Sequence, residues 1–179
     1  MDADIFERFL YQFYKMYWSD QPAKNSLHYI KVTIMKINIG LSEKNLKNSA
    51  EQLSGVLANE MTLYIKTRKF HWNVSGESFM ELHKLFEAQY TQLEESIDEI
   101  AERIGKLGHK TIGTMQEFSK LSTIKESPGK YASSKDLLVE LLKDHETVIV
   151  MLRKNVDEAG ERNKDAGTAD FLTGLMEQH

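Results

Sequence analysis

The chain of 179 residues contains no cysteine. This absence excludes disulfide bonds, thiolate metal sites, iron–sulfur clusters and cysteine nucleophiles. Proline is rare, with only Pro22 and Pro128, so long stretches are free to form uninterrupted helices. No apolar run approaches the roughly 18 residues that a membrane-spanning helix needs. These absences predict a soluble, intracellular and mostly helical protein.

An excess of positive charge is also missing. The net charge is −4 and the isoelectric point is about 5.9, so we do not expect a globally basic nucleic-acid-binding protein. Glycine-rich phosphate loops, a Ser–His–Asp order and a nucleophile elbow are absent as well, which leaves hydrolase and nucleotide-binding functions without support. Hydrophobic residues make up 41% of the chain, enough to bury the core of one domain.

The first 34 residues differ in composition from the rest. Eight of the 17 aromatic residues lie between Phe6 and Tyr29, and their spacing predicts a short amphipathic helix at about 4–18. Alternating apolar residues then predict an extended arm at about 29–41. We therefore divide the chain into an aromatic-rich extension, residues 1–34, and a helical domain, residues 35–179.

Helical periodicity begins after Ser42, a good N-cap residue. Apolar residues then recur at intervals of three and four, with expected stops at Gly108 and Gly160. The pattern predicts helices at about 43–72, 79–107, 134–159 and 168–179, with a short helix at 114–121. In the third long helix, the residues expected to face inward are Leu138, Leu141, His145, Val148, Leu152 and Val156.

Together these helices predict an all-α fold, a four-helix bundle with a short extra helix between the second and third helices. The fourth helix is expected to be about 18 Å long, against about 43 Å for the second. It is thus truncated relative to its neighbours. We expect either that the natural chain continues beyond His179 or that another subunit covers the exposed apolar surface.

Ionisable residues flank the apolar stripe of the second helix. His83 and Glu87 are four residues apart, as are Asp98 and Glu102, so each pair shares a helix face. His71 closes the preceding helix, a short turn away. Imidazole and carboxylate groups without thiolates suit iron, manganese or zinc.

Helix geometry constrains how these residues meet. His83 and Asp98 lie 15 residues apart, which is about 22 Å along one helix. Two chains packed antiparallel about a twofold axis would bring one chain's histidines to the other's Asp98 and Glu102. The spacing therefore predicts a metal centre shared between subunits. A ferritin-type site inside the bundle is disfavoured, because none of the six histidines follows a glutamate by three residues.

Each candidate also has an ordinary structural interpretation. The flanking charges can be solvated or paired with Lys84 and Arg103. The remaining candidates have equally plain alternatives: a satisfied core histidine for His145, packing for Trp72, and surface carboxylates for Asp165 and Asp170.

Residues 66–76 have the sequence Lys-Thr-Arg-Lys-Phe-His-Trp-Asn-Val-Ser-Gly. They are followed at specific intervals by His83, Glu87, Asp98 and Glu102. In this combination the chain closely resembles the Dps family, the bacterial mini-ferritins, over about residues 35–179. The resemblance implies a hollow, cytoplasmic homododecamer that oxidises Fe(II), preferentially with hydrogen peroxide, stores the ferric mineral and protects DNA from oxidative damage.

The resemblance also implies roles for residues. His71 from one subunit, with Asp98 and Glu102 from its partner, would be the main iron ligands, and His83 and Glu87 would complete a second, weaker position. Zinc could substitute for iron. Trp72 would lie near the iron site, and the segment containing Asp165 and Asp170 would line iron-entry pores.

The chain departs from the family pattern in three places. Glu87 stands where aspartate is more usual. Family members start near the equivalent of Met35, so residues 1–34 are either a real extension or the result of a misassigned start. The lysine-rich tail through which many relatives bind DNA is missing, so DNA binding and association with the nucleoid are not favoured. The alternative function is a helical assembly or DNA-associating scaffold without redox chemistry.

Overall fold

The computed structural model describes residues 37–179, and within that range it contains helices and no strands, which confirms the all-α prediction. The predicted helix at 4–18 and most of the arm at 29–41 lie outside the described residues. Among residues 37–179, no helix combines the length and hydropathy that crossing a lipid bilayer requires. The elements are α2 (Glu43–Asn73), α3 (Phe79–Lys106), α4 (Met115–Leu121), α5 (Ser134–Asp157), the π-helical segment η1 (Glu158–Arg162) and α6 (Ala166–Gln178).

Local sequence signals set most of the helix ends. The Ser42 side chain accepts a hydrogen bond from the backbone N–H of Asn45 and caps α2, as predicted. Gly108 follows the end of α3 with φ of +82°, a left-handed conformation that glycine adopts without steric cost. The four α-helices of the bundle and the short helix α4 begin and end within two residues of their predicted limits, although α5 passes directly into the π-helical segment η1.

The predicted helix stop at Gly160 is wrong. Gly160 lies inside η1, where the backbone N–H of Asn163 bonds to the Glu158 carbonyl five residues earlier, at 3.0 Å. This wider turn carries the helix past the glycine. The chain leaves the helix only at Lys164, which has φ of +55°.

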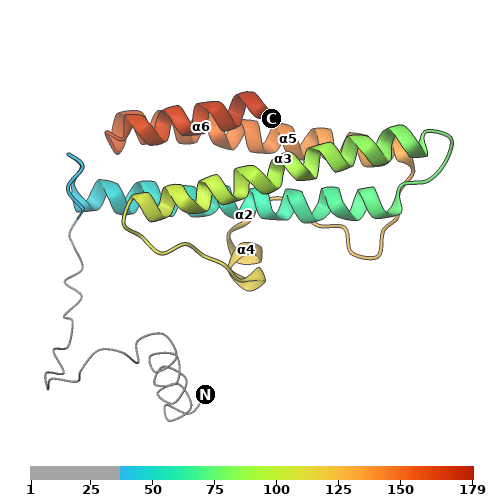
Figure 1. The fold of residues 1–179 in the computed structure, drawn as a ribbon, viewed down its shortest axis with the longest axis horizontal. Helices are drawn as coiled ribbons and strands as arrows, with labels where there is room; N and C mark the ends of the chain where they lie inside the picture. The colour runs from blue at the N-terminus through green and yellow to red at the C-terminus, as the bar shows by residue number, and fades with distance from the viewer. Residues whose placement is uncertain (1–36) are drawn as a thin grey trace, which may run out of the picture. The chain divides into compact units, whose positions relative to one another are not determined.

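The long helices form two antiparallel pairs, α2 with α3 and α5 with α6 (Figure 1). Their inner faces bury a continuous core, in which each fully buried large side chain contributes about 1.5–3 kcal/mol through removal from water. The largest fully buried apolar residues are Phe86, Leu53, Leu57, Leu63, Ile100, Ile104, Leu107, Leu152 and Leu172.

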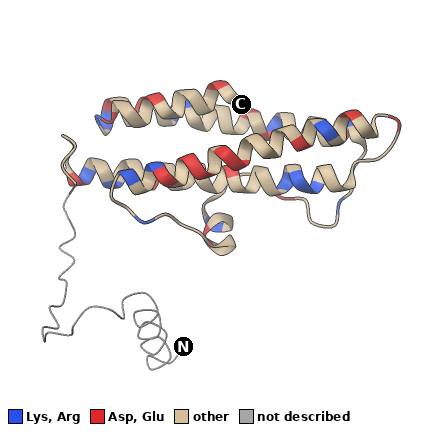
Figure 2. Ribbon diagram, in the orientation of Figure 1, with Lys and Arg blue, Asp and Glu red and all other residues tan. Residues whose placement is uncertain are grey.

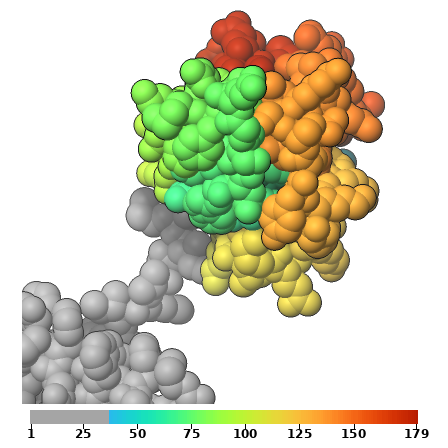
Figure 3. Space-filling model, turned by 90° about the vertical axis from the view of Figure 1, so that its right-hand side faces the viewer, coloured from blue at the N-terminus to red at the C-terminus, as the bar shows by residue number. Residues whose placement is uncertain are grey.

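The apolar face of α5 is rotated slightly from its predicted position. Leu138 was expected to face inward but is 39% exposed, whereas Leu137 and Leu141 are buried. Since α6 has 13 residues and α5 has 24, α6 lies beside only the half of α5 nearest η1 (Figure 1). At the other end of the bundle, the start of α5 and the α2–α3 turn lie side by side at the surface (Figure 3).

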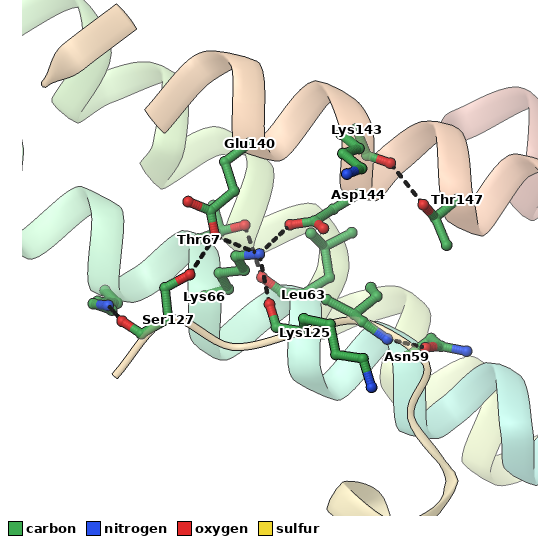
Figure 4. Close-up of polar contacts among 12 residues, drawn as sticks. Asn59, Leu63, Lys66, Thr67, Lys125, Ser127, Glu140, Lys143, Asp144 and Thr147 are labelled. Atoms are coloured by element: carbon green, nitrogen blue, oxygen red, sulfur yellow. Dashed lines mark hydrogen bonds and ion pairs between the residues drawn. The ribbon is translucent and has the colours of Figure 1, made fainter. Parts of the chain in front are cut away.

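A buried lysine connects α2 to α5 and to the loop after α4 (Figure 4). The Nζ atom of Lys66 lies 2.7 Å from a Glu140 oxygen and 2.6 Å from an Asp144 oxygen, and it donates to the Lys125 carbonyl at 2.9 Å. Ser127 donates to the Glu140 carboxylate from the same loop. Because the Lys66 residue is only 5% exposed, these partners replace the water that its charge has lost.

The two carboxylates differ in their electrostatic balance. Burial raises the pKa of Asp144 by more than its contact with Lys66 lowers it. Burial acts in the same direction on Glu140, but the hydrogen bonds from Lys66 and Ser127 hold the pKa of Glu140 below its ordinary value. The network therefore depends on the charge of Lys66, which two carboxylates share.

We expect Lys66→Met to lower the free energy of unfolding by about 3 kcal/mol at pH 7, because it leaves two neighbouring carboxylates without their cation. The loss should shrink toward pH 4, where protonation removes the repulsion between the carboxylates. Urea unfolding followed by circular dichroism measures both effects. Lys69→Met is the matched control: Lys69 bonds to the same loop, at the Ser127 carbonyl, and acts on Glu140 only through its field, without an ion pair to either carboxylate. A cost in Lys69→Met as large as that in Lys66→Met would contradict the explanation.

Candidate metal centre

Two histidines meet where α2 gives way to α3. His71 lies in the last turn of α2, and His83 lies in the second turn of α3. The turn between them is tight: the Val74 N–H bonds back to the Phe70 carbonyl, and Gly76 adopts φ of +101°. Their rings stack with centroids 3.7 Å apart.

Reciprocal hydrogen bonds hold the two imidazole rings. Nδ1 of His71 lies 2.9 Å from the carbonyl oxygen of His83, and Nδ1 of His83 lies 3.0 Å from the carbonyl oxygen of His71. A carbonyl oxygen only accepts, so each Nδ1 must carry a proton. In each neutral ring Nε2 is therefore the atom with a free lone pair, the form in which histidine binds metal. Neither Nε2 atom has a hydrogen-bond partner among residues 37–179.

Aromatic side chains enclose this histidine pair. Phe79 stacks on the His83 ring at 5.0 Å, and the rings of Tyr90 and His71 meet nearly at right angles with centroids 5.2 Å apart. Tyr90 in turn carries the guanidinium group of Arg68 over its face, 4.4 Å from the ring centroid, and Arg68 also bonds to the hydroxyl of Tyr64. The sequence analysis missed this cluster, although the spacing of Tyr64, Arg68 and Trp72 places all three on one face of α2.

The predicted carboxylates lie on α3 but not beside the histidines. Glu87 is exposed, one turn after His83. Asp98 is exposed and lines a groove of about 710 Å³ between α2 and α3. Glu102 is exposed and pairs with Lys106 at 3.2 Å. Acidic residues gather along the second half of α3 (Figure 2).

One subunit does not assemble a complete set of ligands. Because α3 is one continuous helix, about 22 Å separates His83 from Asp98 along its axis. Among residues 37–179, no three histidine, aspartate or glutamate side chains are close enough together to hold a metal ion. The structure therefore joins His71 to His83 and keeps both apart from Asp98 and Glu102.

Trp72, the next residue after His71, is not part of the core. Its side chain is 64% exposed, and the Arg68 guanidinium lies 5.5 Å from its ring centroid. Packing inside the subunit therefore does not explain this tryptophan.

Asp165 and Asp170 have different environments. Asp170 is exposed, as expected for a surface carboxylate. Asp165 is only 4% exposed, so the interpretation of Asp165 as a surface carboxylate is wrong. Asp165 caps α6 by accepting from the backbone N–H of Thr168 at 3.0 Å, and it pairs with Arg103 at 3.2 Å. Arg103 is thus the partner of Asp165, and not of the flanking carboxylates of α3.

His145 is only partly satisfied as a core histidine. Its Nδ1 lies 2.9 Å from Nδ1 of His179, and Nε2 of His179 lies 2.8 Å from a Glu60 oxygen. Nε2 of His145 is buried without a partner among the described residues. No spacing rule connects these three residues, because they come from α5, α6 and α2.

The comparisons with known proteins agree with this architecture. The ferritin-like domain model matches residues 50–179. A low-temperature-induced protein of Nostoc is 45% identical over 144 residues, which cover 80% of each chain. The DNA protection during starvation protein of Brevibacillus brevis is 34% identical over 142 residues, covering 75% of this chain and 94% of that protein.

Solved structures show the same fold. The Dps protein of Vibrio cholerae, described as a member of a superfamily of ferritin-like diiron-carboxylate proteins, superposes with a TM-score of 0.74 at 29% identity, over 80% of this chain and 89% of that one. The Dps protein of Bacillus brevis gives a TM-score of 0.71 at 30% identity, over 75% and 89% of the two chains. By sequence and by fold, this chain belongs to the Dps family of ferritin-like proteins.

Proposed function

We propose that this protein oxidises Fe(II) at centres shared between two subunits and stores the ferric product inside a homododecameric cage. The observation that carries the proposal is the pair of histidines whose Nδ1 atoms bond to carbonyl oxygens, which leaves both Nε2 atoms free for a metal. The carboxylates that an iron site needs lie about 22 Å away on the same helix, within reach only of a second subunit.

Each ligand has a distinct role in this proposal. His71 of one subunit and Asp98 and Glu102 of its partner bind the first Fe(II), and Glu102 is suited to bridging two ions. His83 and Glu87 serve the second position, directly or through water. Glu87 is one methylene longer than the usual aspartate, which alters how closely it approaches the metal and therefore the affinity of that position.

In the proposed reaction, one hydrogen peroxide oxidises two Fe(II) ions. Two Fe(II) ions give up one electron each, and the peroxide takes both electrons and two protons to become two molecules of water. Anionic carboxylates favour Fe(III) over Fe(II), so Asp98 and Glu102 assist the loss of electrons. Because both electrons pass to the same peroxide, the reaction avoids the one-electron cleavage of peroxide that releases hydroxyl radical. Zinc, which accepts the same ligands but has no redox chemistry, would compete for the site.

The entry path for Fe(II) belongs to the same proposal. The segment with Asp165 and Asp170 is predicted to line pores of the cage. Asp170 presents an exposed carboxylate, whereas the Asp165 carboxylate bonds to Thr168 and Arg103. In this arrangement Asp170 attracts the cation, and Asp165 holds the start of α6 in place.

Protection of DNA follows from removal of Fe(II) and peroxide, the two reagents that generate hydroxyl radical. The relative from Brevibacillus brevis is named for DNA protection, and we place this protein with DNA in the bacterial cytoplasm. Direct binding is not favoured, since a net charge of −4 repels phosphate. Protection would then be chemical and would not require association with the nucleoid.

Replacing both carboxylates tests the shared centre. After anaerobic loading with Fe(II) and addition of hydrogen peroxide, ferric absorbance should appear at least about a hundredfold more slowly in Asp98→Ala/Glu102→Ala than in the wild type. Loss of a residue that only supports a metal ligand already lowers activity by up to about a hundredfold, and these two residues are proposed to be ligands themselves. The matched control is Glu95→Ala/Glu99→Ala, which removes two exposed carboxylates of the same helix at the same spacing.

The oligomer must remain intact in both variants, as measured by light scattering. Slow oxidation confined to the first variant supports the shared centre. Equal rates in all three proteins would reject it and would leave the chain as a helical scaffold without redox chemistry.

A second experiment concerns the tryptophan beside His71. We expect Trp72→Phe to oxidise Fe(II) at an unchanged rate but to release more hydroxyl radical, because the exposed indole beside the site intercepts oxidising equivalents. Spin trapping during peroxide addition measures the release. An unchanged yield of hydroxyl radical would contradict this role for Trp72.

A further inference from the structure

Three ionisable side chains meet in the bundle core away from the proposed iron ligands. Glu60 lies in the middle of α2 and is fully buried. His179 follows the last turn of α6, and its side chain is 3% exposed. His145 lies on α5, the helix that pairs with α6.

Hydrogen bonds connect the three residues in a line. Nε2 of His179 lies 2.8 Å from the Glu60 carboxylate and donates a hydrogen bond to it. Nδ1 of His179 lies 2.9 Å from Nδ1 of His145. One proton fits between these two nitrogens, because a donor on one side requires a lone pair on the other.

The line ends in atoms that have no partner. Oε2 of Glu60 and Nε2 of His145 are buried and make no hydrogen bond to the described residues. Burial, and after it the field of His179, lowers the pKa of His145 to about 4. The ionisable groups connected to His145 are His179, which follows α6, and Glu60 of α2 beyond His179; the preceding residue, Asp144 of α5, pairs with Lys66 of α2.

We propose that Glu60, His179 and His145 form an acid-sensitive latch that fastens the end of α6 to α2 and α5. With one proton between the rings, His179 bonds to both neighbours and the helix end stays closed. A further proton on His145 goes to Nε2, where it places a positive charge in the core and leaves a buried N–H group without an acceptor. Release of His179 from the core relieves both costs.

The direction of the pH effect follows from the two states of His145. In the open state the pKa of His145 returns to about 6.5, so the open state binds more protons than the closed one between about pH 4 and 6.5. The closed latch is therefore most stable above that range and loses stability as the pH falls through it. For these two pKa values, the opening equilibrium rises roughly twentyfold between pH 7 and pH 5.

Hydrogen exchange of the α6 backbone in the protein of residues 1–179, without added iron, tests the latch. After correction for the intrinsic pH dependence of exchange, the amides of residues 172–178 should open roughly twentyfold more at pH 5 than at pH 7. In His145→Gln this additional opening should vanish, because glutamine fills the position and does not titrate. His145→Phe serves the same purpose if the glutamine variant fails to fold.

Ser96→Ala is the matched control. Ser96 donates to the Gln178 side chain at 3.1 Å and anchors the same end of α6 without titrating. Its loss should increase opening equally at both pH values and leave the pH effect intact. Equal pH dependence in the wild type and in the His145 variants would overturn the latch, as would its absence in the wild type. Neither result would bear on iron oxidation, which these measurements do not involve.

Discussion

The fixed rise of an α-helix is the constraint on which the arrangement of this protein depends. In α3 the backbone hydrogen bonds run unbroken over 28 residues, so its histidine end and its carboxylate end are held far apart. No side-chain rearrangement closes such a gap. Under the proposed function, chemistry therefore requires assembly, and an isolated subunit cannot oxidise iron at an incomplete site. The rigidity that separates the ligands also sets their spacing for a partner related by a twofold axis.

Local rules predicted most of the fold. Ser42 and Gly108 mark helix ends through their own conformations, and the stripe on α3 needs no knowledge of the rest of the chain. Some predictions from the sequence were wrong where contacts between residues far apart in the chain determine the structure. Asp165 is buried because it meets Arg103, 62 residues earlier, whereas the π-helical turn at Gly160 is held by the local bond from Asn163 to Glu158. Leu138 is exposed because the packing of α5 selects Leu137 and Leu141 instead.

The candidate site was partly predictable. Spacing brought out the ionisable residues of α3 and the need for two subunits, and the resemblance supplied their roles. The hydrogen bonds between His71 and His83 were not foreseeable, because they depend on how the turn at Gly76 brings two backbone carbonyls against two rings. The partners of His145 were hidden for a similar reason, since the register of α6 decides where His179 lies.

Under the proposed function, the reciprocal bonds of His71 and His83 have a consequence for the kinetics of metal uptake. An imidazole free in solution spends most of its neutral population with the proton on Nε2, and such a ring must exchange tautomers before that nitrogen can coordinate. Here the two backbone carbonyls have already moved each proton to Nδ1. Under the proposed function, an arriving ion meets a lone pair on each Nε2, so its capture does not wait for a proton to move between the ring nitrogens.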